Sequence, residues 1–153
     1  MRPSSRPSPE LTVALLDGAR SVIQRGWVRN AWYVLEAPDG RQRVVGPGSL
    51  TSRRFGTVVA ACLVGAVVEA GHRYSGERGI SGPAIDVLWQ SLQESEQAPP
   101  YGAGWEPPVL RTLQVRDLAC WNDAPERSRD DVLRLIDAAA HRVAVGVPAT
   151  AAM

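Results

Sequence analysis

The stretch FGTVVAACLVGAVVEA, residues 55–70, contains the most apolar run of the chain and decides the fold that the sequence predicts. Its apolar side chains recur at the i, i+3, i+4 spacing of one helix face. The opposite side carries small or β-branched residues, and a helix that is apolar on nearly every side is buried. We therefore expect a buried central helix from Phe55 to Ala70, with Thr51 or Ser52 as its N-cap.

The segment before this run predicts an amphipathic helix that begins after Ser8 and ends at Gly26. Ser8 is a favoured N-cap residue, and Pro9 fits the first helical turn. The apolar stripe of this helix comprises Leu11, Leu15, Ala19, Val22 and Ile23. Trp27 follows directly and is placed to fold back on that stripe.

Residues 30–46, NAWYVLEAPDGRQRVVG, have strand character instead. Aromatic and β-branched residues flank APDGR, which is typical of a turn. The sequence predicts one short β-hairpin here. Because an isolated two-stranded hairpin is only marginally stable in water, it must pack against the helices.

Three further helices are expected. The third begins after the cap Ser81, and its apolar face comprises Ile85, Leu88, Trp89 and Leu92. A short fourth helix is expected over residues 110–121. The last runs from Ser128 to about Val143, and Asp131 three residues after Ser128 resembles a capping box.

Residues 122–127 connect the last two helices. Asn122 and Asp123 are expected to bond nearby backbone N–H groups in an Asx turn, and Pro125 stops the fourth helix. Arg127 is four residues after Asp123 and can close an ion pair over the turn. Every polar residue of this segment therefore has a structural explanation. A functional role for Asp123, as a general acid or base, stays open as the alternative.

These elements predict a mainly α fold: a small orthogonal helical bundle around a buried central helix, with one short β-hairpin. The chain has 153 residues, which suits one domain. We expect a disordered tail over residues 1–8, a single helical domain over residues 9–145 and a flexible tail over residues 146–153.

The chain resembles an uncharacterised, mostly actinobacterial family of small proteins with three landmarks. These are a helix ending in Gly-Trp, a Cys-x-x-Gly-Ala motif, and Trp-Asn-Asp-x-Pro before a terminal helix. Here they are Gly26-Trp27, CLVGA (residues 62–66) and WNDAP (residues 121–125). The resemblance spans about residues 10–143. It implies an architecture, and it assigns no catalytic residues because the family has no assigned activity. Leu63-Val64 stand where the family's common form has Ala-Leu.

The composition excludes several chemistries. All seventeen basic residues are arginines, so no lysine can form a Schiff base, anchor pyridoxal phosphate or serve a P-loop. The net charge of +1 provides no general attraction for nucleic acid or a membrane surface. The longest apolar run, Val58 to Val68, is far shorter than the roughly 20 residues of a membrane span. With no signal peptide, we expect a cytoplasmic protein.

Metal and cofactor chemistry is not expected. The two cysteines and two histidines are Cys62, Cys120, His72 and His141, and their wide spacing fits no zinc pattern. No flavin or nicotinamide fingerprint is present. The cysteines are expected to be reduced thiols. Cys62 on an apolar face is expected to pack as a small hydrophobe, with nucleophilic catalysis as the alternative.

Aromatic residues and arginines outside the core stripes are candidate ligand contacts. Tyr101 and Trp105 lie in the proline-rich loop EQAPPYGAGWEPPV, where they form either a contact surface or a cover for the core. Arg53 and Arg54, with Arg41 and Arg43 of the hairpin, are either an anion site or a solvated basic patch. The remaining candidates are Trp27, Trp32, Trp121 and Asn122.

Two function classes stay open. The first is a binding or interaction domain for a small molecule or a protein segment, using these aromatic residues and arginines. The second is a small cofactor-independent lyase, isomerase or cyclase acting on a natural-product intermediate. It would use Asp123 beside Trp121 as acid or base, because acid–base catalysis needs no lysine. Homodimerisation is left open.

Overall fold

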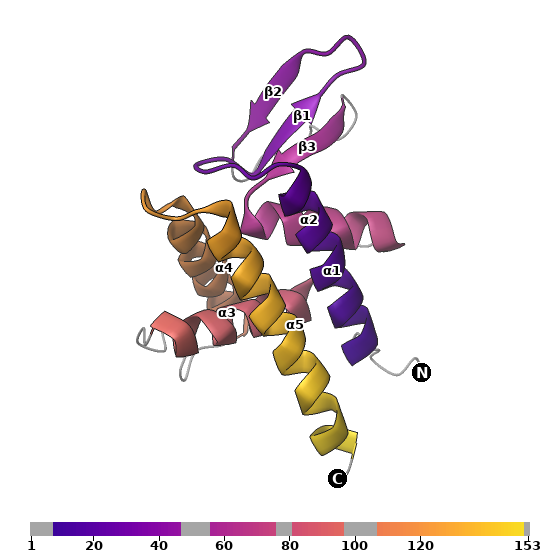
Figure 1. Ribbon diagram of the computed structural model, residues 1–153, viewed down its shortest axis with the longest axis vertical. Coiled ribbons are helices and arrows are strands. Elements are labelled where there is room, and N and C mark those ends of the chain that lie inside the picture. Colours follow the sequence, from indigo (N-terminus) through magenta and orange to yellow (C-terminus); the bar gives the residue numbers. More distant parts are fainter. Residues whose placement is uncertain (1–7, 47–55, 76–80, 97–106, 152–153) are drawn as a thin grey trace.

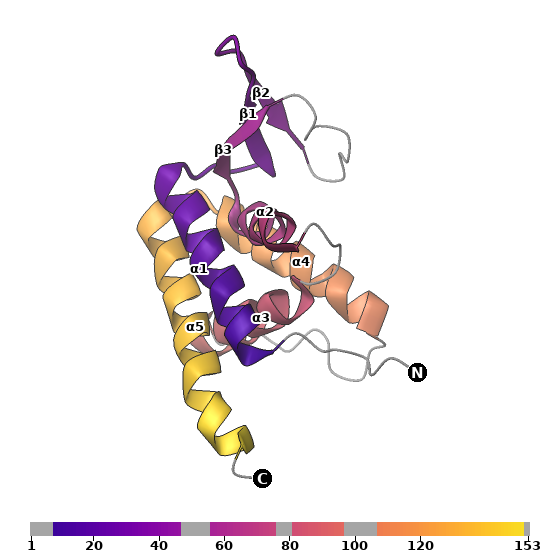
Figure 2. The same ribbon diagram turned by 90° about the vertical axis from the view of Figure 1, so that its right-hand side faces the viewer.

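The computed structural model describes residues 8–46, 56–75, 81–96 and 107–151. In these ranges the chain forms five α-helices and one three-stranded antiparallel sheet, which confirms the predicted mainly α fold (Figure 1). The sheet lies at one end of the helical body in both Figure 1 and Figure 2.

Helix α1 (Pro9–Arg25) forms as the sequence predicts. The Ser8 hydroxyl accepts the backbone N–H of Leu11 at 3.1 Å and so caps the first turn. At the other end, the N–H of Gly26 donates to the carbonyl of Val22 at 3.1 Å. Four residues of the predicted apolar stripe are buried, namely Leu15, Ala19, Val22 and Ile23. Leu11 is only partly buried, and the buried side also includes Leu16 and Thr12.

The predicted hairpin is present, and a third strand extends it. Strands β1 (Tyr33–Glu36) and β2 (Gln42–Val45) pair antiparallel through a turn in which Gly40 has φ 86°. Strand β3 (Thr57–Ala61) pairs antiparallel with the other side of β1, so the strand order is β2-β1-β3. Each strand of the hairpin thus belongs to a sheet of three.

The prediction of one helix from Phe55 to Ala70 is wrong in its first half, where β3 forms. Helix α2 (Leu63–Ser75) begins only after Cys62. In a run where nearly every residue is apolar, the helical and strand periods are both satisfied, so periodicity alone does not separate them. Three β-branched residues at positions 57–59 favour a strand, and β1 gains a second partner.

The second half of the run is the buried helix that the sequence predicts. The side chains of α2 that face the interior include Leu63, Val64, Ala66 and Val67, all buried. Helix α2 packs against α1 and β3, and it lies across α1 in both ribbon views (Figures 1 and 2). Phe55, Thr51 and Ser52 lie outside the described residues.

Helices α3 (Gly82–Glu96) and α4 (Pro107–Asp123) follow. The N–H of Ile85 donates to the carbonyl of Ser81 at 3.0 Å, at the predicted start of α3. Helix α4 is longer than predicted, because it begins at Pro107 rather than near residue 110. Proline fits the first turn of a helix, where its missing N–H has no partner to lose.

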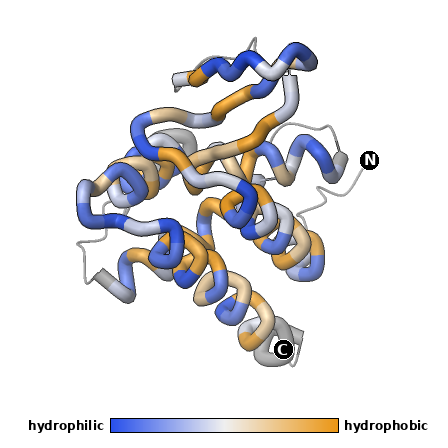
Figure 3. Tube along the Cα trace, turned by 45° about the horizontal axis from the view of Figure 1, so that its top comes forward, coloured by the Kyte–Doolittle hydropathy of each residue, from blue (hydrophilic) through white to orange (hydrophobic). Residues whose placement is uncertain are grey.

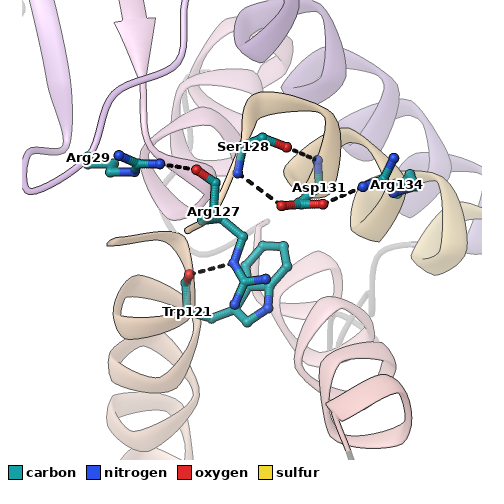
Figure 4. A network of polar contacts seen from close by, with 6 residues as sticks. All are labelled: Arg29, Trp121, Arg127, Ser128, Asp131 and Arg134. Carbon is teal, nitrogen blue, oxygen red and sulfur yellow. Dashed lines mark hydrogen bonds and ion pairs between the residues drawn. The ribbon is translucent and has the colours of Figure 1, made fainter. Parts of the chain in front are cut away.

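Helix α5 (Arg129–Ala151) opens with the predicted capping box (Figure 4). The Ser128 hydroxyl accepts the N–H of Asp131 at 3.1 Å, and the Asp131 carboxylate accepts the N–H of Ser128 at 2.9 Å. The helix continues past its predicted end near Val143. It packs against α1 and α3.

The core lies between the helices and the inner face of the sheet. Along the trace in Figure 3, apolar and hydrophilic residues alternate within each helix, as expected for helices with one buried face. The largest fully buried apolar side chains include Leu15, Leu16, Ile23, Leu88, Leu118 and Ile136. The core therefore draws on α1, α3, α4 and α5 around α2.

Gly65 tests the packing of α2 against the sheet. A Cβ at this position would lie 2.3 Å from the carbonyl oxygen of Trp32, a backbone atom that cannot turn away. Alanine normally stabilises a helix relative to glycine by about 1 kcal/mol. We expect the opposite for Gly65→Ala, a loss of about 1–3 kcal/mol from overpacking, measured by urea unfolding followed by circular dichroism.

The matched control is Gly146→Ala in α5, where an added Cβ meets nothing within 4 Å. This variant should be as stable as the natural chain or more so. If Gly65→Ala unfolds at the same urea concentration as Gly146→Ala, the close approach of Trp32 to α2 is wrong.

Candidate functional site

The three landmark motifs of the sequence meet at the N-terminus of α2. Trp27 follows α1, Cys62 precedes α2, and Asn122 lies near the end of α4. Residues 27 and 61 form a parallel bridge, in which the N–H of Val28 donates to the carbonyl of Ala61 at 3.2 Å. The segment after α1 is thereby fixed beside the start of α2.

Asn122 is the hub of this region, with a fully buried side chain. Its Oδ1 accepts the indole N–H of Trp27 at 2.8 Å and the backbone N–H of Leu63 at 3.1 Å. Its Nδ2 donates to the carbonyl of Val28 at 3.1 Å and to the Asp123 carboxylate at 3.0 Å. The amide thus uses both of its donors and both of its acceptor positions.

The prediction that Asn122 and Asp123 form a local Asx turn is therefore wrong. Both are the last residues of α4, and their side chains reach segments about 60 and 95 residues earlier in the chain. A sequence pattern cannot indicate this role, because the partners come together only through folding.

Cys62 serves as the N-cap of α2. Its Sγ accepts the N–H of Gly65 at 3.3 Å, and its own N–H donates to the carbonyl of Trp32 at 3.1 Å. The thiol is buried, and this burial raises its pKa to about 11. A protonated thiol that caps a helix is poorly suited to nucleophilic attack.

Asp123 fastens the segment between α1 and β1. Its Oδ1 accepts the backbone N–H of Asn30 at 2.8 Å, and Asn30 has φ 59°, in the left-handed region. Asparagine is among the residues that best tolerate this conformation. The same oxygen also accepts the Asn122 side-chain amide, so the Asp123 carboxylate links the backbone at Asn30 to the end of α4.

Arg127 does not form the predicted ion pair with Asp123. Its Nε donates to the carbonyl of Trp121 at 2.9 Å, and its guanidinium carbon lies 4.1 Å from the centre of the Trp121 ring. Stacking a guanidinium on an indole is favourable and keeps the group oriented. Figure 4 shows the side chain folded back over this ring.

Arg29 was not among the sequence candidates. Its guanidinium lies 4.9 Å from the centre of the Trp27 ring and donates to the backbone carbonyl of Arg127 (Figure 4). Two Trp–Arg stacks, Trp27–Arg29 and Trp121–Arg127, therefore lie together at the surface. A tryptophan two positions before an arginine was the only sequence signal for the first stack.

The structure brings together five predicted site residues: Cys62, Asp123, Trp27, Trp121 and Asn122. Trp32 joins them through its carbonyl, while its half-buried ring contacts Tyr33 edge-on at a centroid distance of 6.2 Å. Arg53, Arg54, Tyr101 and Trp105 lie outside the described residues. Arg41 and Arg43 are exposed on the hairpin.

Within the described ranges, no three His, Cys, Asp or Glu side chains gather closely enough to hold a metal ion. His72 and His141 are both exposed. Among the same residues, no helix combines the length and the apolar character that crossing a membrane requires.

The two cysteines provide a direct test of the Cys62 environment. Cys62 is buried with a raised pKa, whereas Cys120 is an exposed free thiol. At pH 8, three units below a pKa of about 11, only about one Cys62 thiol in a thousand is ionised. We expect a maleimide to label Cys120 alone in the native chain and both thiols in denaturant, as read by mass spectrometry. Rapid double labelling of native protein would contradict the capping role.

Replacing Asn122 tests the hub. In Asn122→Ala the buried N–H groups of Leu63 and Trp27 lose their acceptor, and we expect a loss of about 2–5 kcal/mol in unfolding free energy. Asn122→Asp keeps the shape but turns two donors into acceptors that face Val28 and Asp123, so it should also destabilise. The control Gln90→Ala, exposed on α3, should change stability by less than about 0.5 kcal/mol.

The comparisons with known proteins identify a family without a known activity. The search of curated proteins and the search of solved structures returned no match. One family model, described as a family of unknown function (DUF6197), matches residues 7–142 and so includes all three motifs around Asn122. The chain belongs to this family of unknown function, DUF6197.

Proposed function

We propose that this chain is a binding domain for a small molecule or a protein segment, and that its ligand docks where residues 27–30 meet residues 121–128. The observation that carries the proposal is the pair of Trp–Arg stacks at this junction. The few residues that dominate the binding energy at protein interfaces are enriched in tryptophan, tyrosine and arginine. Both stacks are held by hydrogen bonds to backbone or to Asn122, so the surface is formed in advance.

The contacts of the reactive side chains also support binding over catalysis. Cys62 is used as a helix cap with its proton retained, and Oδ1 of Asp123 accepts two hydrogen bonds that hold the fold. A carboxylate that acts as a general acid or base must lie within hydrogen-bond reach of the proton that it transfers. The proposal includes a cytoplasmic location, which the two free thiols fit, since reducing compartments keep cysteines unpaired.

A metabolite extract provides the test. Purified chain is incubated with the extract, and the soluble fraction and the retained species are both analysed by mass spectrometry. A binding domain retains a species without converting it, so the bound and unbound species together match the original extract. Conversion of one species into another would overturn the proposal in favour of the lyase, isomerase or cyclase alternative.

Hydrogen exchange shows where the retained species binds on the chain. The same measurement applies to a protein segment that the purified chain retains. We expect protection to increase over residues 27–30 and 121–128 and to stay constant in α3. Protection confined to other parts of the chain would show that the docking surface is wrong.

Asp123 separates the two function classes. Asn at this position can still accept the N–H groups of Asn30 and Asn122, so Asp123→Asn should keep its stability within about 0.5 kcal/mol and keep ligand retention. Asp123→Ala removes both bonds and should lose about 1–2 kcal/mol, measured by urea unfolding. If Asp123→Asn stays folded but abolishes a conversion seen with the natural chain, the carboxylate is catalytic.

A further inference from the structure

We infer that the junction of residues 27–30 with residues 121–128 is a site for a ligand bearing more than one oxyanion group, carboxylate or phosphate, bound by Arg29 and Arg127. This inference rests on the proposed function and names the ligand class of the same surface. Guanidinium groups match the geometry of both oxyanions through paired N–H donors.

The first observation is that these two cations lack an acidic partner. Several arginines of the described chain pair with carboxylates, for example Arg20 with Asp137 and Arg111 with Asp86, both at 2.8 Å, whereas the exposed Arg129 bonds only the carbonyl of Gln24. Within the described residues, neither Arg29 nor Arg127 has a carboxylate oxygen within the 4.0 Å of an ion pair. Their protein partners are neutral: backbone carbonyls and tryptophan rings.

The second observation is a buried donor on Arg29. Its Nε is buried and has no hydrogen-bond partner in the described chain. Removing part of a charged group from water without compensation is unfavourable, and such an atom in a native structure calls for an explanation. Arg29 is half-buried, and its guanidinium charge is delocalised over three nitrogens, so an anion bound to the exposed part offsets the charge without bonding the buried Nε.

The geometry also sets the kind of ligand. In Figure 4 the guanidinium of Arg29 approaches the backbone of Arg127 from one side, whereas the guanidinium of Arg127 lies on the other side, over Trp121. We therefore expect a ligand that contacts both guanidinium groups to carry more than one anionic group. Two nearby acids bond these segments: Asp123, whose Oδ1 accepts the N–H groups of Asn30 and Asn122, and Asp131, whose carboxylate accepts the N–H of Ser128 and pairs with Arg134.

The test is calorimetric titration of the full chain with four probes at equal ionic strength. Pyrophosphate and citrate each carry several oxyanion groups, and inorganic phosphate and acetate are their simple counterparts. We expect pyrophosphate or citrate to bind at one site at least tenfold more tightly than its counterpart. Which of the two binds distinguishes a phosphate ligand from a carboxylate ligand. No measurable binding of either probe would overturn the inference.

Three variants assign the binding to the arginines. Arg29→Gln should weaken the affinity at least tenfold, and Arg127→Lys should weaken it severalfold, because lysine keeps the charge but not the planar pair of donors. The control Arg134→Gln removes the same charge from a guanidinium that is already paired with Asp131 beside the site (Figure 4). It should leave the affinity within twofold. An equal loss in all three variants, or none in Arg29→Gln, overturns the inference.

Hydrogen exchange on the natural chain gives a second readout that needs no variant. The probe should protect residues 27–30 and 121–128, and saturation with the probe without such protection contradicts the site. A retained ligand that protects this surface but is unaffected by Arg29→Gln would overturn the oxyanion inference and leave the proposed function intact. If pyrophosphate or citrate binds but the chain retains no species from the extract, the result contradicts the proposed function and leaves the oxyanion inference intact.

Discussion

The buried N-terminus of α2 is the constraint on which the rest of this structure depends. The first N–H groups of a helix have no partner within the helix, and here they lie in the core, away from water. Cys62 satisfies one of them and Asn122 another. Since Asn122 also bonds Trp27 and Val28, the same amide joins three segments that are distant in sequence.

This arrangement explains the three landmark motifs as one unit. Gly26 lies where an added Cβ would be 2.4 Å from the carbonyl oxygen of Val59, and Gly65 meets the backbone of Trp32 in the same way. The two glycines allow the chain segments to approach. The Asn122 amide then bonds the segments at Trp27 and Leu63, while the Cys62 side chain caps its own helix. Side chains that could have served catalysis therefore hold the fold.

The stacked arginines Arg29 and Arg127 have no ion-pair partner among the described residues. Their tryptophan and carbonyl partners orient the guanidinium groups without cancelling the charge. A surface formed in advance loses little conformational entropy when a ligand binds. The binding proposal and the ligand class both follow from this combination of fixed orientation and free charge.

The sequence by itself determined the elements whose signals are local. The capped helix from Pro9, the hairpin around Gly40 and the Ser128–Asp131 capping box depend on neighbours within a few residues, and all three form as predicted. Composition also excluded lysine chemistry, since no fold can supply a missing side chain.

Tertiary structure decided the remainder. The apolar run of residues 55–70 fits both a helix and a strand, and only pairing with β1 assigned its first half to the sheet. The local sequence around Asn122 and Asp123 predicts a turn. Their actual partners, at Trp27, Asn30 and Leu63, are about 60 to 95 residues away, so no local pattern indicates them. Local patterns record what a residue can do with its neighbours, whereas the fold determines which distant groups it meets.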